Sequence, residues 1–246
     1  MDADKYRLRG ELLNANLHLV QPGARSVTVT SYYDGSQVEI PLDPRWSPAR
    51  NAQNYYKKYG KSKTALKEKQ IQLDETLAEI DYLESVFAFA ERAASVEEID
   101  LLRAELTENG YLRQRKSRAK DAKSRKAKAK PYTYTLPSGS TVLVGRNNKE
   151  NDFLTFKKAS STDIWLHTKD IPGSHVILLT EGKAPSEEDL RWAARIAAHH
   201  SKAAGSANVP VDYTKVRYVK KPSGAKPGYV IFTHNRTLYE DPALPE

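Results

Sequence analysis

A loop rich in amide and guanidinium groups lies in the second half of the chain. Gly145, Arg146, Asn147 and Asn148 are consecutive, and Asn151 follows three residues later. Arg and Asn side chains bind phosphates or base edges through paired hydrogen bonds, and a glycine lets the backbone approach closely. The same residue types also cap helices and form turns. The loop is therefore a candidate nucleic-acid contact, with turn formation as the alternative.

Two histidines form a second candidate site. Asp163, Trp165 and His167 alternate along one predicted strand, and Gly173 and His175 lie at the start of the next. Two histidines and an aspartate can bind a metal ion. However, His167 and His175 are separated by a hairpin and no third ligand is close in sequence. We therefore expect no metal, and instead a buried, hydrogen-bonded histidine pair that supports the neighbouring loops together with Asp163, Trp165 and Gly173.

Three lysines surround a predicted hairpin loop near the C-terminus. Lys220 and Lys221 precede the loop, Lys226 lies within it, and Pro222 and Pro227 restrict its conformations. Such a group can be a solvated basic tip or a clamp for RNA phosphates.

Several chemistries are excluded by residue type. The chain contains no Cys, which rules out disulfides, thiolate metal clusters and a Cys nucleophile. Ser174 precedes His175 without the strand–turn–helix context of a nucleophilic serine, and no glycine-rich phosphate fingerprint is present. The sequence predicts a binding protein without a cofactor, and not an enzyme.

Positive charge is concentrated in one segment. The net charge is +8, yet residues 113–130 alone hold ten Lys and Arg against one Asp. This segment has no apolar side chain larger than Ala, so it cannot form a core and is typical of a linker or a solvated helix. Its cations are candidate RNA contacts, among them Arg113, Arg115, Lys116 and Arg118.

The segment before this basic linker, residues 1–112, is predicted to be mainly helical. A short helix occupies residues 5–20, and alternating residues around Asp34-Gly35 predict a β-hairpin. A helix over residues 48–92 follows, and Ser95 with Glu98 forms a capping box for another. Large side chains recur every seven residues in the long helix, as in half of a coiled-coil seam: Tyr59, Leu66, Leu73, Ile80 and Phe87. We expect a partner helix or self-association.

The segment after the basic linker, residues 131–246, is predicted to be a compact α+β domain with a largely antiparallel sheet. Hairpins are expected at residues 132–145 and 216–233, strands at 163–167 and 174–180, and a helix from Ser186. A loop and short helix over residues 146–160 should turn Phe153 and Phe156 inward.

Long sequence motifs resemble one known family. GRNNKENDFLTFKKASSTDIWLHTKDIPGSHVILL, AAHHSKA, KKPSGAKPGYVIF and RTLYEDP resemble the RNA-binding domain of the NFACT family, with its RqcH, NEMF and fibronectin-binding protein A-like branches. GELLNANLHLV, SYYDG, IPLDPRWSPARNAQNYYKKY and IDYLESV resemble the coiled-coil and middle region of that family. The resemblance covers essentially the whole chain and implies a C-terminal fragment, because the family's N-terminal domains have no counterpart here.

The resemblance implies a function in ribosome-associated quality control. Members of the family bind a stalled large ribosomal subunit (rRNA) that carries peptidyl-tRNA, and the intact bacterial protein recruits alanyl-tRNA to add a C-terminal tail. This chain should then provide ribosome, rRNA and tRNA contacts without tailing activity of its own. We expect the RNA-binding residues in the basic segment and the C-terminal domain: Arg113, Arg115, Lys116, Arg118, Arg146, Asn147, Asn148, Asn151, Lys220, Lys221 and Lys226.

Two alternatives remain open. The first is an adhesin that binds fibronectin, because streptococcal relatives are described as fibronectin-binding surface proteins without a signal peptide. The second is a scaffold that recruits a protein partner through the coiled coil. Residues 1–10 are charged and no run of 18 apolar residues occurs, so we expect neither a signal peptide nor a membrane span. The expected location is the cytoplasm, or the cell surface for the adhesin.

Overall fold

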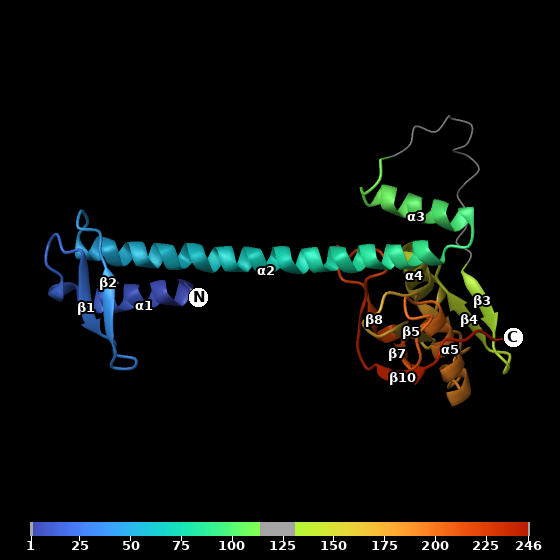
Figure 1. Ribbon diagram of the computed structural model, residues 1–246. Coiled ribbons are helices and arrows are strands. Elements are labelled where there is room, and N and C mark those ends of the chain that lie inside the picture. Colours follow the sequence, from blue (N-terminus) through green and yellow to red (C-terminus); the bar gives the residue numbers. More distant parts are fainter. Residues whose placement is uncertain (1, 114–130, 246) are drawn as a thin grey trace. The chain divides into compact units, whose positions relative to one another are not determined.

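The structure is a computed structural model that describes residues 2–113 and 131–245. It confirms an α+β fold with one long helix and a largely antiparallel sheet (Figure 1). The chain divides into two compact units, Met1–Thr76 and Leu77–Glu246. Three of the predicted RNA-binding residues, Arg115, Lys116 and Arg118, lie outside the described residues.

The first unit is built on the predicted hairpin. Its elements are α1 (Asp2–Ala15), the 3-10 turn η1 (Leu17–Leu19), β1 (Ser26–Thr30), β2 (Gln37–Pro41) and the start of α2 (Pro48–Arg92). Gly35 in the hairpin turn has a φ of +72°, which glycine adopts without steric cost. Side chains from both helices and both strands form the core: Leu12, Leu13, Val29, Ile40, Leu42, Ala52 and Tyr55.

The long helix has the predicted bounds, and an apolar face remains exposed along it. Leu66, Leu73, Ile80 and Phe87 are 43%, 51%, 46% and 58% exposed. Large apolar side chains are costly to leave in water, as expected of a seam that is covered by a partner. The coiled coil itself stays a prediction.

The second unit begins with the end of α2, which packs against α3 (Val96–Glu108). The hydroxyl of Ser95 accepts a hydrogen bond from the backbone N–H of Glu98 at 3.2 Å, so the predicted N-cap is confirmed. Tyr82, Val86, Phe89 and Leu102 form the small core between the two helices.

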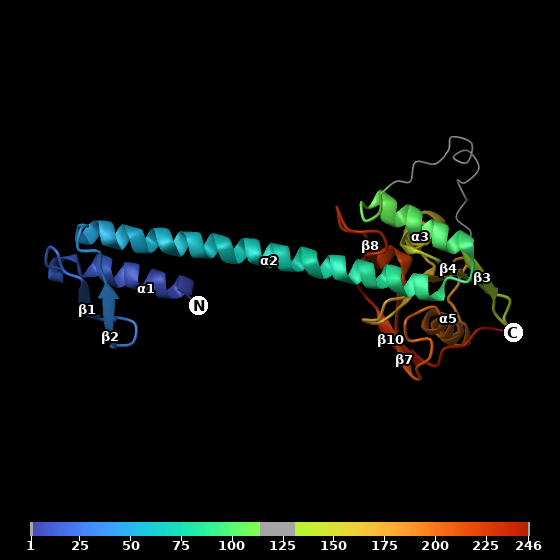
Figure 2. The same ribbon diagram turned by 45° about the horizontal axis from the view of Figure 1, so that its top comes forward.

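A six-stranded antiparallel sheet forms the centre of the second unit (Figures 1 and 2). Its order is β10-β7-β5-β6-β4-β3. The strands are β3 (Tyr132–Thr135), β4 (Thr141–Val144), β5 (Ile164–Thr168), β6 (Val176–Leu178), β7 (Val209–Lys215) and β10 (Arg236–Glu240). Strands β7 and β10 were not predicted from sequence.

Both faces of this sheet are covered. Helix α5 (Glu187–His199) packs on one face. The opposite face carries the elements α4 (Asn148–Phe153), the π-helical turn η2 (Leu154–Lys158), the 3-10 turn η3 (Val216–Tyr218) and the hairpin β8 (Val219–Lys220) with β9 (Ile231–Phe232).

Side chains on both faces of β5 are buried. Ile164 and Leu166 are buried against α5, while Trp165, 1% exposed, is buried on the other face. Phe153 was expected to point inward, yet it is 41% exposed, because the π-helical turn places Leu154 in the core instead. No helix in the described part of the chain is long and apolar enough to span a membrane.

Candidate functional site

The Asn-rich loop after β4 is held by its own side chains. Asn147 is the N-cap of α4, and its Oδ1 accepts a hydrogen bond from the backbone N–H of Glu150 at 2.8 Å. Asn151 Oδ1 accepts from the backbone N–H of His175 at 2.9 Å. Asn148 Nδ2 donates to Ser85 Oγ at 2.8 Å and to Glu105 Oε1 at 3.1 Å. All three amides are buried.

Two glycines are required by these buried amides. A Cβ on Gly145 would lie 2.1 Å from Asn151 Oδ1, and a Cβ on Gly228 would lie 2.3 Å from Asn148 Oδ1. The glycines therefore allow close approach within the protein. The structure shows that Asn148 ties the loop to α2 and α3, that Asn151 ties it to His175 just before β6, and that Asn147 caps α4. The contact of these amides with RNA stays a prediction.

Arg146 forms a paired contact with a carboxylate of the same loop. Its Nη2 donates to Glu150 Oε1 at 2.7 Å and its Nε donates to Glu150 Oε2 at 3.1 Å. This hydrogen bonding raises the pKa of Arg146. The side chain is 15% exposed, so the paired guanidinium positions the loop and leaves little of its surface accessible.

The predicted supporting residues gather around Trp165. The His167 ring stacks on the indole at 5.8 Å between centroids, and the His175 ring meets it edge-on at 5.2 Å. Burial lowers the pKa of His167, and burial followed by the neighbouring His167 lowers the pKa of His175 well below its ordinary value. Both rings are therefore neutral at physiological pH, and His175 Nδ1 is hydrogen-bonded to Thr155 Oγ1 at 2.9 Å.

Asp163 and Gly173 support the same region through backbone contacts. Asp163 is buried, and its carboxylate accepts hydrogen bonds from the backbone N–H groups of Ser160 and Thr180 at 2.8 and 2.9 Å. Gly173 forms an isolated bridge with Ser201. In residues 2–113 and 131–245, no group of three or more His, Cys, Asp or Glu residues is arranged to hold a metal ion.

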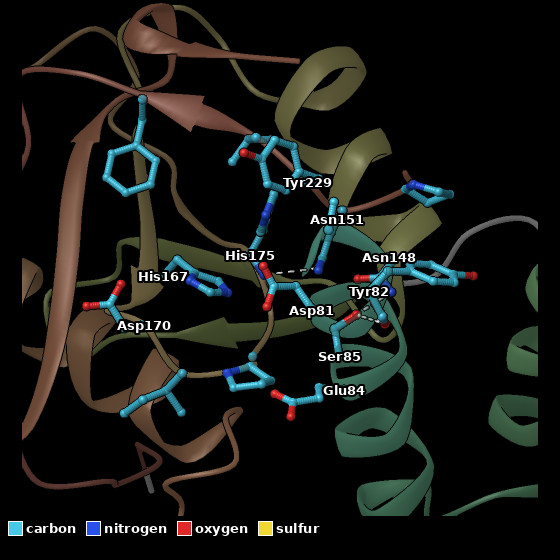
Figure 3. A pocket seen from close by; sticks show the side chains of 18 of the residues that line it. Asp81, Tyr82, Glu84, Ser85, Asn148, Asn151, His167, Asp170, His175 and Tyr229 are labelled. Carbon is cyan, nitrogen blue, oxygen red and sulfur yellow. Dashed lines mark hydrogen bonds between the residues drawn. The ribbon is translucent and has the colours of Figure 1, made fainter. Parts of the chain in front are cut away.

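A cavity of about 420 Å³ opens beside the two histidines. Figure 3 shows Asp81 of α2 pointing toward His167 and His175, with Glu84 and Asp170 around the same opening. Carboxylates repel phosphate at short range. This cavity is therefore poorly suited to an RNA backbone.

The predicted basic residues have different environments. Lys221 forms an ion pair with Asp152. Lys226 donates to Tyr111 OH at 3.1 Å, and its ammonium lies over the rings of Tyr82 and Tyr111. Lys220 and Arg113 are exposed.

An exposed basic and aromatic group was missed by the sequence analysis. Tyr218 and His234 stack at 4.3 Å between ring centroids with 24° between their planes, and the Arg217 guanidinium carbon lies 4.9 Å from the centre of the Tyr218 ring. Lys215 and Arg217 are exposed, as is His234. The signal was present as basic and aromatic residues interleaved in KVRYVKK.

Two lysines of η2 precede a segment that is bonded to η3. Lys157 and Lys158 are exposed. A backbone hydrogen bond of 3.2 Å from Arg217 N–H to Ser161 O joins the segment after η2 to η3. Stacked rings, guanidinium planes and clustered cations are the groups that bind single-stranded RNA, so we define Lys157, Lys158, Lys215, Arg217, Tyr218 and His234 as the basic-aromatic surface.

Comparison with known proteins agrees with this chemistry. Residues 1–125 match the family model for NFACT N-terminal and middle domains, and residues 130–234 match that for the NFACT protein RNA binding domain. The chain belongs to the NFACT family. The basic-aromatic surface and the Asn-rich loop both lie within its NFACT RNA-binding domain.

Individual NFACT relatives are similar over nearly the full chain. Proteins named Rqc2 homolog RqcH from Bacillus subtilis (strain 168) and Streptococcus suis (strain 05ZYH33) are each 44% identical over 98% of this chain. The chain spans 42% of the length of these relatives. A solved structure, the C-terminal part of the fibronectin/fibrinogen-binding protein from Streptococcus suis, is 35% identical with a TM-score of 0.73, and covers 98% of this chain and 84% of that chain.

Proposed function

We propose that this chain is the ribosome- and RNA-binding portion of a ribosome-associated quality-control factor. The match of residues 130–234 to the NFACT RNA-binding domain carries the proposal. The names of the RqcH relatives support the quality-control function.

The basic-aromatic surface is the proposed RNA contact. Its cations neutralise phosphates, and the stacked Tyr218 and His234 rings offer a platform for an unpaired base. Lys220 continues the positive charge along β8. The cations predicted at residues 113–130 would add affinity that does not depend on RNA sequence.

The finer proposal concerns the partner and the reaction of the whole factor. We propose that the intact protein binds the stalled large subunit with peptidyl-tRNA in the cytoplasm and supports C-terminal alanine tailing. Within it, this chain acts as a binding element and not as an enzyme.

Fibronectin binding is a second candidate function. It is favoured by the name of the similar protein from Streptococcus suis, a fibronectin/fibrinogen-binding protein. Exposed cations suit an acidic glycoprotein as well as RNA, so both partners must be compared under identical salt conditions.

Co-sedimentation with purified large ribosomal subunits tests the proposal. At physiological salt the chain should pellet with the subunits, and high salt should release it because phosphate contacts are salt-dependent. Binding to immobilised fibronectin is measured at the same protein concentrations. Tight fibronectin binding without subunit binding would contradict the proposal and support the second candidate.

A pair of variants locates the contact. Changing Arg217 to Gln and Tyr218 to Ala together should weaken subunit binding, because a phosphate contact and a stacking ring are lost. Arg103 is exposed on α3, so Arg103→Gln is a charge-matched control and should bind as the parent does. Equal binding by both proteins would exclude the basic-aromatic surface.

A further inference from the structure

A second cavity, of about 470 Å³, lies where the end of α2 meets β3, the Asn-rich loop and the end of α5. Arg92 lines it from α2, Tyr132 and Tyr134 line it from β3, and His199 and His200 line it from the end of α5. The volume falls within the range that suits a small ligand.

Arg92 is unusual among the residues of this cavity. In the part of the chain that the structure describes, its Nη1 atom is buried and has no hydrogen-bond partner. Burial lowers the pKa of Arg92 to about 10. An unpaired buried cation is costly unless an anion compensates it, and the carbonyl groups at the end of α2 supply only a fraction of a charge.

The acidic groups nearby compensate Arg92 only in part, because burial lowers its pKa by more than the charge of Glu91 raises it. Glu98 also lines the cavity, but its carboxylate accepts hydrogen bonds from Tyr132 OH and the backbone N–H of Ala94. Arg146, a second guanidinium in the wall, is already paired with Glu150. Among the described residues, the cavity thus presents one guanidinium whose buried Nη1 has no hydrogen-bond partner, with its carbon 5.3 Å from the centre of the Phe89 ring.

Aromatic rings stand beside this cation. The His200 ring lies 5.2 Å from the Tyr132 ring and 5.6 Å from the Tyr134 ring, and its Nε2 is hydrogen-bonded to Tyr134 OH at 2.8 Å. His199 meets His200 edge-on at 5.2 Å. Flat rings next to a cation are the combination that binds a nucleotide, through its base or ribose and its phosphate.

We propose that this cavity binds one backbone phosphate of single-stranded RNA on Arg92, with the attached nucleoside against Tyr132 and Tyr134. The site rests on the proposed function, because its ligand is the RNA that the chain is proposed to bind. The cavity beside His167 and His175 is lined by carboxylates, so it is not part of the proposed phosphate site.

The bound phosphate should leave a signature on the two histidines. Burial comes first among the causes that lower the pKa of His199 and His200, and the charge of Arg92 adds to it in both. An anion on Arg92 removes that repulsion and raises both values. NMR spectra of the histidine rings, recorded with and without uridine monophosphate, report this change directly.

Three proteins are compared in the test: the parent chain, Arg92→Gln and Arg103→Gln. Binding of a fluorescent 12-nucleotide uridine RNA is followed by anisotropy at constant salt. Loss of a charge-assisted phosphate contact should weaken binding roughly tenfold to a hundredfold for Arg92→Gln, and Arg103→Gln should change it little. Without ligand, Arg92→Gln should melt close to the parent, because the variant removes a partly buried charge together with its contact to the Phe89 ring.

The outcomes separate this subsite from RNA binding as a whole. Equal RNA affinity of the two variants, with the parent binding tightly, would overturn the subsite and leave the proposed function standing. Histidine shifts that depend on Arg92, in a parent that does not bind RNA, would support a phosphate site and contradict the proposed function. Monophosphate binding as tight as that of the RNA would overturn the assignment to an RNA backbone.

Discussion

Replacing Asn148 with Ala should destabilise the second unit strongly. Its side chain is 3% exposed and joins α4 to α2 and α3 through two hydrogen bonds. The bond to Glu105 involves a carboxylate and contributes about 1.5–3 kcal/mol, and the bond to Ser85 contributes about 0.5–1.5 kcal/mol. We therefore expect the free energy of unfolding to fall by about 2–4.5 kcal/mol.

The expected loss of stability is large because one hydrogen-bond partner of Asn148 is a charged carboxylate and not a neutral group. Glu105 is fully buried, and burial raises its pKa while the hydrogen bond from Asn148 opposes that rise. In a Glu105→Gln background the same bond joins two neutral groups. Asn148→Ala should therefore cost about 1–2 kcal/mol less in that background.

Urea unfolding at neutral pH, followed by circular dichroism, measures both effects. Asn235 is exposed, so Asn235→Ala is the control and should change stability by no more than about 0.5 kcal/mol. If Asn148→Ala unfolds like the control but binds RNA much more weakly, the amide is an RNA contact and its structural assignment is refuted. If Asn148→Ala is destabilised but, while still folded, binds RNA as tightly as the parent, the Asn148 side chain has a structural role and is not an RNA contact.

Four more predictions concern other parts of the chain. Trp165→Ala should lower the unfolding free energy by about 3–5 kcal/mol and Trp165→Phe by less, since the indole N–H has no partner among the described residues; thermal melts decide this. The pKa of His200 is lowered to about 3 in the folded protein. As the pH falls, the unfolded chain therefore binds the proton before the folded protein does. The stability that the neutral ring provides is complete above about pH 6.5. Below that pH stability should fall by up to about 1.4 kcal/mol per pH unit until about pH 3, and His200→Gln should flatten this slope in urea titrations. Changing Arg113, Arg115, Lys116, Arg118 and Lys120 to Gln should reduce the salt slope of RNA binding by roughly 4, and an unchanged slope would exclude this segment. Leu73→Asp with Ile80→Asp should lower helicity and favour the monomer, whereas an unchanged sedimentation mass and circular dichroism spectrum would argue against the seam.

Elements with strong local signals were predicted well from the sequence. The hairpin β1–β2 follows from Asp34-Gly35, and α3 follows from the Ser95 cap. Strand β7 was missed because it contains Pro210 and Asp212, which are uncommon inside strands. Strand β7 is stabilised by its pairing with β5 and β10. These partner strands lie elsewhere in the sequence, so the seven residues of β7 alone do not predict the pairing.

The candidate sites were harder to predict because they combine distant segments. Arg92 ends one helix, while Tyr132 and His200 come from elements far along the chain. No spacing rule connects these positions. Arg92 alone resembles any basic residue in the last turn of a helix, and it became a candidate only because its buried Nη1 has no hydrogen-bond partner among the described residues.

The three amides show how sequence separation limits what can be predicted. The cap formed by Asn147 involves Glu150, three residues away, and belongs to the turn chemistry recognised as an alternative. Asn151 bonds to His175 and Asn148 to Glu105 and Ser85, which are 24, 43 and 63 residues away. Gly228 has the same explanation, since it leaves room for Asn148, which lies far away in the sequence, whereas Gly145 leaves room for the nearby Asn151. A loop rich in Asn and Gly therefore has the same composition whether its amides face RNA or the interior, and only their partners distinguish the two.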